Sequence, residues 1–186
     1  MIARWVSIVF HPFAMVSVMV GVVAAARQAS GGAAASVALV VLFTIAPLGV
    51  LMWHQVRRGR WKNADASNRA ERPALYLAGG LALTALLASL LAMAPQSFMV
   101  RGVIATFAML AVCAAVTRWI KVSLHMAFAT LAAITLAFMR SPVGYALVLA
   151  LPAIAWSRFT LQRHTSLELA LGTMIGASAG MALHWL

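Results

Sequence analysis

Two residues near the carboxyl end have the types and spacing that nucleophilic chemistry needs. His164 and Glu168 are four positions apart, so they share a face if the segment is helical. A carboxylate that accepts a hydrogen bond from one imidazole nitrogen fixes the tautomer and leaves the other nitrogen to attack or take a proton. Arg158 adds a planar guanidinium suited to phosphate oxygens. The alternative interpretation is a polar helix start with basic interfacial residues.

A second segment, residues 121–125, combines a hydroxyl with a histidine. Ser123 precedes His125 by two positions at a predicted helix start, where the hydroxyl and backbone N–H groups can point at an anion. Lys121 adds a cation to the same segment. Taken alone, this pattern is more typical of an interfacial histidine at the start of a helix.

A third segment, residues 62–73, contains several cations and two acids. Arg72 precedes Pro73, which suits the first turn of a following helix. Arg69 and Arg72 share a face if the stretch is helical. The alternative, a solvated basic loop, explains the preceding residues 57–60 better than it explains the compact stretch 65–73.

The elements that position these segments are apolar. Of the 186 residues, 64% are hydrophobic and 9% are charged, whereas a soluble domain carries about 25% charge. Water-soluble globules are therefore excluded. We predict an all-α fold, a polytopic transmembrane helix bundle that forms one domain over residues 1–186.

The predicted bundle has six or seven spans, because a bilayer core needs about 20 apolar residues in a helix. The predicted spans are Val6–Ala26, Ser36–Val56, Ala74–Ala94, Phe98–Thr117, Leu124–Met139, Pro142–Trp156 and Leu167–Trp185. The first is interpreted as a retained helix rather than a cleaved signal peptide. The fifth and sixth are short, and the alternative to two spans is a re-entrant pair.

Seven crossings divide the polar residues unequally between the two sides of the membrane. Eleven of the fourteen Lys and Arg residues fall on one side, together with all three acids, His125 and His164. The positive-inside rule makes that side cytoplasmic. Ionisable groups at membrane depth are costly and mark candidate sites. The net charge of +11 is explained by this distribution, so no nucleic-acid partner is predicted.

These segments resemble the signature of the type 2 phosphatidic acid phosphatase superfamily, which also includes the vanadium haloperoxidases. The third family motif, Ser-Arg-x5-His-x3-Asp, matches Ser157, Arg158 and His164 in spacing, with Glu168 in place of Asp. The second, Pro-Ser-Gly-His, is similar at two positions only, which are the serine and histidine of segment 121–125. The likeness covers residues 62–168.

The first family motif, Lys-x6-Arg-Pro, is altered. Arg72 and Pro73 match, but the lysine position is Asp65. A shifted register from Lys62 to Arg69 restores Lys-x6-Arg and loses the proline. We expect Asp65 to pair with Arg69, and Arg69 to replace the missing lysine.

The resemblance implies a membrane phosphatase that hydrolyses a lipid phosphate or an isoprenoid (di)phosphate. It implies that His164 forms a phosphohistidine, that Glu168 orients it and that His125 protonates the leaving oxygen. It implies that Arg72, Arg158 and Ser123 hold the phosphoryl oxygens. No metal or other cofactor is implied. Many bacterial relatives act on the outer face of the inner membrane, whereas the charge count places this site on the cytoplasmic face.

Three alternatives have different chemistry. One is transfer of the phosphoryl group to an acceptor lipid, and another is an inactive relative that serves as a transporter or scaffold. The third is a haem protein, since the chain has five histidines: His11, His54, His125, His164 and His184. His11 is predicted in mid-helix with no partner at its level.

The single cysteine, Cys113, predicts neither a disulfide nor a cysteine metal site.

Overall fold

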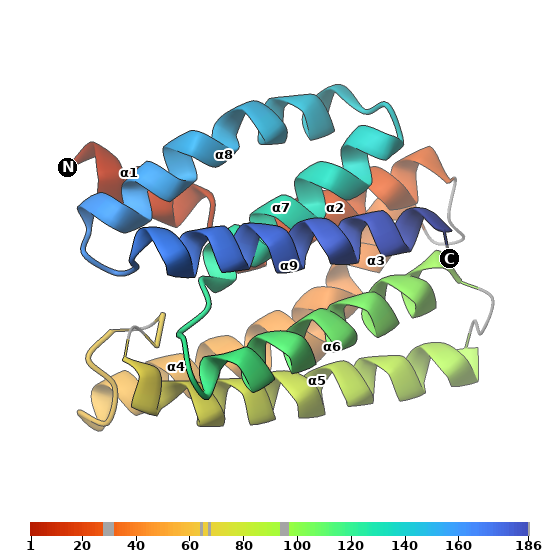
Figure 1. The fold of residues 1–186 in the computed structure, drawn as a ribbon. Coiled ribbons are helices and arrows are strands. Elements are labelled where there is room, and N and C mark those ends of the chain that lie inside the picture. The colour runs from red at the N-terminus through yellow and green to blue at the C-terminus, as the bar shows by residue number, and fades with distance from the viewer. Residues whose placement is uncertain (28–31, 64, 67, 94–96, 186) are drawn as a thin grey trace.

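The chain is described by a computed structural model over residues 1–27, 32–63, 65–66, 68–93 and 97–185. These residues form a bundle of helices joined by turns (Figure 1). The α-helices are α1 Ile2–Val9, α2 Pro12–Ala26, α3 Gly32–Val40, α4 Ala46–Arg57, α5 Arg72–Met93, α6 Phe98–Thr117, α7 Leu124–Phe138, α8 Pro142–Thr160 and α9 Ser166–Trp185. A π-helix, Val41–Ile45, joins α3 to α4, and a 3-10 turn, Arg69–Glu71, leads into α5. The prediction of an all-α fold is confirmed.

Length and composition allow five of these helical stretches to cross a membrane. They are Gly32–Arg57, Arg69–Met93, Phe98–Thr117, Pro142–Thr160 and Ser166–Trp185. A sixth forms if α1 and α2, which are bent by 44° at their junction, count as one span. The remaining apolar helix, α7, has 15 residues. The predicted polytopic bundle is therefore confirmed, and its helices are those of an integral membrane protein.

The first predicted span is wrong in one respect, because it is two helices rather than one. Pro12 has no N–H to donate, and its ring clashes with the preceding turn, so α1 ends before it and α2 begins at it. His11 lies at the break, where its Nδ1 accepts a hydrogen bond from the Phe13 N–H at 3.3 Å. The prediction of a mid-helix His11 is corrected accordingly.

Helix α7 lies inside the bundle and packs against α9, α8 and α2. Most of its side chains are buried, and many are alanines, which allow neighbouring helices to approach closely. Helix α8 continues four residues beyond its predicted end at Trp156, to Thr160. That extension brings Arg158 into the last turn of a helix long enough to span the bilayer.

Two glycines on α9 set its distance from α7. A Cβ on Gly172 would lie 2.5 Å from the Ser123 carbonyl oxygen, and one on Gly176 would clash with the carbonyl oxygen of Ala127. Only glycine permits this approach. The contact fixes the start of α9 against the start of α7.

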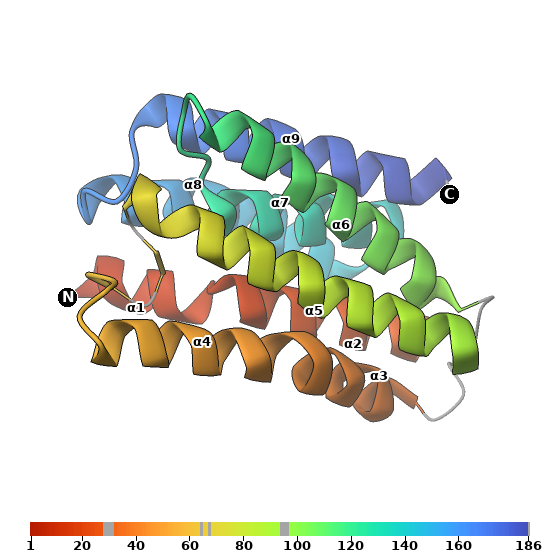
Figure 2. The same ribbon diagram turned by 90° about the horizontal axis from the view of Figure 1, so that it is seen from below.

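The three polar segments gather at one end of the bundle. Figures 1 and 2 show the loop before α5, the loop before α7 and the turn before α9 at the end that holds the amino terminus. The carboxyl terminus lies at the opposite end. Helices α5 and α6 lie between the first two of these segments along the chain, and α7 and α8 lie between the second and the last. Each pair runs away from this end and back, so the chain returns to the same end.

Candidate active site

His164 lies in the turn before α9 and is buried. Its Nδ1 is 2.8 Å from Oε2 of Glu168, one helical turn further along. The start of α9 fixes this carboxylate, since the Thr165 N–H donates to Oε2 and the Glu168 N–H donates to Oγ1 of Thr165. This reciprocal pattern caps the helix and holds the carboxylate toward the imidazole.

Lys121 connects segment 121–125 to the segment that carries His164 and Glu168. Its Nζ donates to the carbonyl oxygen of Arg163 at 2.7 Å and lies 3.6 Å from Oε2 of Glu168. The Ser123 N–H donates to the backbone carbonyl of Glu168 at 3.2 Å. These contacts bring the loop before α7 directly against the His164 segment.

Arg158 is held by two elements that lie far away in the sequence. Its Nη1 donates to Oγ of Ser7 on α1 at 2.7 Å, and its Nη2 is 2.6 Å from Oδ2 of Asp65. The expected pairing of Asp65 with Arg69 is therefore wrong, because Arg69 is exposed and donates to the carbonyl oxygen of Trp119 at 3.0 Å. The carboxylate at the position where the resembled family has a lysine thus holds a guanidinium that is 2% exposed.

Arg72 lies in the site, whereas Lys62 does not. The Arg72 side chain is buried, and its Nε donates to the carbonyl oxygen of Ala66 at 2.8 Å. Lys62 is exposed, and its backbone N–H donates to Oε1 of Glu71. The shifted Lys-x6-Arg pattern thus consists of two exposed cations, Lys62 and Arg69. The unshifted pattern ends at Arg72, which is buried.

Several buried polar atoms at this end have no hydrogen-bond partner within the described part of the chain. They include Oγ of Ser123, Nε2 of His125, Nη1 of Arg72 and Nε of Arg158, and also Oε1 of Gln55 and Nδ2 of Asn63. Native proteins rarely leave such groups unsatisfied, because each loses its hydration without compensation. Hydroxyl, imidazole and guanidinium groups can all donate, so together they match an anion with several oxygens.

His164 is neutral near pH 7. Burial lowers the pKa of its imidazole below the ordinary value of 6.5. Neighbouring cations lower this pKa further, and they are Lys121, Arg158 and Arg72. A neutral imidazole that donates from Nδ1 to Glu168 carries its lone pair on Nε2. That nitrogen can act as a nucleophile beside bound phosphate.

His11 contacts His125, which the sequence did not predict. The two rings meet edge to face, with centroids 5.3 Å apart. Rings in direct contact leave no room for a porphyrin between them, so this pair does not fit a haem. Within the described ranges, no group of three or more His, Cys, Asp and Glu residues could hold a metal ion.

An apolar cavity of about 110 Å³ opens beside the charged groups. His11, Asp65, Arg72 and His125 line its polar end. Most of the remaining lining consists of apolar side chains of α2, α4, α5, α6 and α7, including Leu48, Met52, Leu75, Leu83 and Phe128, together with Thr44 and Thr106. The arrangement offers an anionic group a cluster of donors and an attached chain an apolar cavity.

Sequence reasoning missed Ser7 and excluded His11. Ser7 lies within an apolar first helix, where nothing in the local pattern marks it. The His11-Pro12 pair carried a signal that could have been used, since a proline in an apolar segment indicates a break. A break of this kind exposes polar groups that a continuous helix would satisfy.

Comparisons with known protein family models, with curated proteins and with solved structures found no match to this chain. The case for a function therefore depends on the residues and their geometry.

Proposed function

We propose that this protein is an integral membrane phosphatase that hydrolyses a lipid phosphate or an isoprenoid (di)phosphate through a phosphohistidine. One observation carries the proposal. A neutral His164, oriented by Glu168, lies at the same end of the bundle as buried donors on Ser123, Arg72 and Arg158 that have no partner among the residues the structure describes. Such a site is poised for nucleophilic attack on a group that carries several oxygens.

In the proposed reaction, Nε2 of His164 attacks phosphorus and the bond from phosphorus to the leaving oxygen breaks. The negative charge of the bound substrate favours the protonated form of His125, which then gives its proton to that oxygen. Water then attacks the phosphohistidine and gives a proton to His125, and the phosphorus–nitrogen bond breaks. The products are inorganic phosphate and the lipid with one phosphoryl group fewer, and both histidines return to their starting protonation states.

The cations stabilise the charge that spreads over the equatorial oxygens during transfer. Arg72 and Arg158 provide fixed positive charge in a buried site, where it is more effective than in water. Ser123 adds a hydroxyl donor. Asp65 and Ser7 hold the Arg158 guanidinium in position, so that its Nε remains to face the substrate.

The substrate class follows from the cavity. A water-soluble phosphate ester would gain nothing from an apolar cavity between membrane helices, whereas an acyl or prenyl chain would be desolvated there. The proposed substrate therefore enters from the bilayer. The excess of basic residues at the active-site end supports a cytoplasmic site in a bacterial inner membrane.

Phosphate release from a panel of lipid phosphates by the purified protein tests the proposal. We expect release that persists in EDTA and falls below about a hundredth in His164→Ala, since removing a nucleophile costs at least this much. His54→Ala, at an exposed histidine, is the matched control and should retain full activity.

Other outcomes separate the alternatives. A new phosphorylated lipid without free phosphate would indicate a phosphotransferase. Absence of both products across the panel would favour the inactive relative that transports or scaffolds. Activity lost in EDTA and restored by magnesium would contradict the phosphohistidine mechanism.

A further inference from the structure

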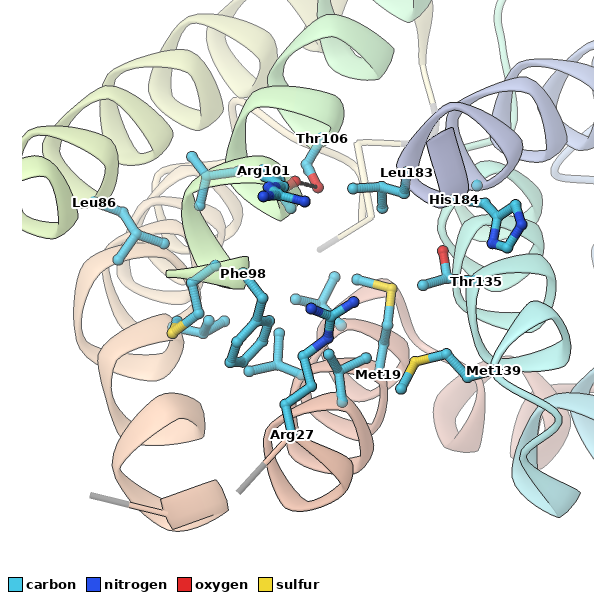
Figure 3. Close-up of a pocket in the computed structure, with 18 of the residues that line it drawn as sticks. Met19, Arg27, Leu86, Phe98, Arg101, Thr106, Thr135, Met139, Leu183 and His184 are labelled. Atoms are coloured by element: carbon cyan, nitrogen blue, oxygen red, sulfur yellow. Dashed lines mark hydrogen bonds between the residues drawn. The ribbon is translucent and has the colours of Figure 1, made fainter. Parts of the chain in front are cut away.

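A second cavity, of about 190 Å³, opens toward the end of the bundle opposite the candidate active site. Figure 3 shows this cavity between α2, α6, α7 and α9. Its polar lining includes Arg27, which directly follows α2, Arg101 in the first turns of α6 and His184 in the last turn of α9.

The two arginines reach the cavity from different helices. Figure 3 shows both side chains extending toward the same central space. His184 is fixed at the rim by stacking on Phe138, with ring centroids 4.5 Å apart. The three acidic side chains of the chain, at positions 65, 71 and 168, all belong to the other end. The rim of this cavity is therefore electropositive.

The body of the cavity is apolar. Side chains of α2, α5 and α6 form most of it, including Met19, Leu86, Phe98 and Val103. One polar group is exceptional, because the Thr135 hydroxyl is buried and has no hydrogen-bond partner among the described residues. A cationic rim above an apolar body matches a molecule with an anionic head and a hydrocarbon chain.

We propose that this cavity binds an anionic phospholipid from the leaflet opposite the active site. The head-group phosphate lies between the guanidinium groups of Arg27 and Arg101, which match phosphate oxygens in shape and charge. One chain of the lipid fills the apolar body. Basic pockets between transmembrane helices are suited to such head groups.

The second cavity adjoins the first. Both are lined by Val16, Thr44, Leu83 and Thr106. A chain bound from the far leaflet therefore ends close to the space assigned to the substrate chain. The two sites can thus meet through their hydrocarbon chains near the middle of the bundle.

Lipid retention measured by native mass spectrometry tests this proposal. Purified protein in a neutral detergent is mixed with phosphatidylglycerol or with phosphatidylcholine of the same acyl chains. We expect the anionic lipid to be retained about tenfold more strongly, because charge-assisted hydrogen bonds to phosphatidylglycerol are not offset by a choline cation. Phosphatidylglycerol is a phosphodiester, so the proposed phosphatase does not consume it.

A double variant, Arg27→Gln with Arg101→Gln, should reduce the preference for phosphatidylglycerol about tenfold. The double variant that keeps the charges, Arg27→Lys with Arg101→Lys, should reduce this preference less. Both arginines are exposed, so folding should be unaffected. Arg140→Gln, at an exposed arginine outside the cavity lining, is the matched control and should leave retention unchanged. His164→Ala should retain the lipid fully, which separates this site from the proposed catalysis.

Three results would overturn the proposal. The first is equal retention of the two lipids, and the second is a loss in Arg140→Gln as large as in the double variant. The third is displacement of the lipid by millimolar inorganic phosphate, which would indicate a simple anion site without a role for the chain.

Discussion

Arg158 is oriented by a carboxylate at the position where the resembled family has a lysine. Asp65 contacts Nη2 at 2.6 Å and Ser7 accepts from Nη1, so the guanidinium is fixed on two sides. An unpaired guanidinium at 2% exposure would carry a large desolvation cost. In the proposed mechanism, Asp65 is therefore a positioning residue for the arginine that would bind phosphate.

Asp65→Asn tests that role. Removing one member of a buried ion pair typically costs about 3 kcal/mol or more, so we expect a lower melting temperature and a higher KM. Arg60→Gln, at an exposed cation, is the control and should change neither quantity. A lower KM in Asp65→Asn would contradict this role, since it would mean that the carboxylate mainly repels the substrate.

The pKa of His164 also predicts how stability depends on pH. The folded imidazole stays neutral below pH 6.5, whereas the unfolded chain binds a proton there. The unfolded state thus binds more protons, and the free energy of unfolding falls as pH drops below about 6.5. One such group contributes a slope of at most about 1.4 kcal/mol per pH unit.

Melting temperatures in detergent between pH 7.5 and about 5 measure this slope. We expect His164→Gln to make this slope smaller than in the unsubstituted protein. His54→Gln, at an exposed histidine, should leave it unchanged. Identical slopes in all three proteins would show that His164 is protonated in the folded state.

At the scale of elements, the contact between α7 and α9 sets the site geometry. Helix α9 carries Glu168 and follows His164, while α7 carries His125 and begins after Ser123. Backbones in near contact at Gly176 leave no space for a methyl group. A displacement here would change the distance between His125 and His164.

Gly176→Ala should therefore lower both the melting temperature and kcat. The added Cβ would meet the Ala127 carbonyl, and the strain should exceed the gain of about 1 kcal/mol that alanine normally brings to a helix interior. Gly80→Ala on α5 is the matched control, because a Cβ there meets nothing within 4 Å. An unchanged kcat in Gly176→Ala would contradict the dependence of the site on this contact.

Hydrophobic runs of about 20 residues predicted most of the helices, because a bilayer constrains length and composition strongly. The runs predicted α6 at its observed bounds, Phe98–Thr117, and α7 within one residue. They did not predict the break at His11, where a proline overrides an otherwise continuous apolar pattern. They also ended α8 too early, since the basic and polar residues after Trp156 are still helical.

The residues of the candidate site were predictable only where their spacing is local. His164 and Glu168 are one turn apart, so their contact follows from helix geometry. The contacts of Arg158 with Ser7 and Asp65 join residues 151 and 93 positions apart, and no local pattern encodes them. Arg69 is near Asp65 in the sequence, but the fold brings Arg158 at the end of α8 to this carboxylate instead.

At the scale of the whole molecule, all three polar segments lie at one end, and orientation decides which compartment this end faces. The positive-inside rule predicts a cytoplasmic active site. Cysteines at Arg60 and Met93, near opposite ends of the bundle, report the two sides when the buried Cys113 is changed to Ala. We expect an impermeant thiol reagent to label Met93→Cys in intact cells and Arg60→Cys only after permeabilisation. The reverse pattern would place the site on the outer face.

The central claim is that His164 becomes phosphorylated during turnover. Rapid quenching of the protein with a lipid phosphate carrying labelled phosphorus tests it most directly, with the labelled peptide mapped by mass spectrometry. We predict an acid-labile, base-stable label on His164 that is absent from His164→Asn and present in His54→Asn. Label on another residue, or unlabelled His164 during a burst of product, would contradict the mechanism.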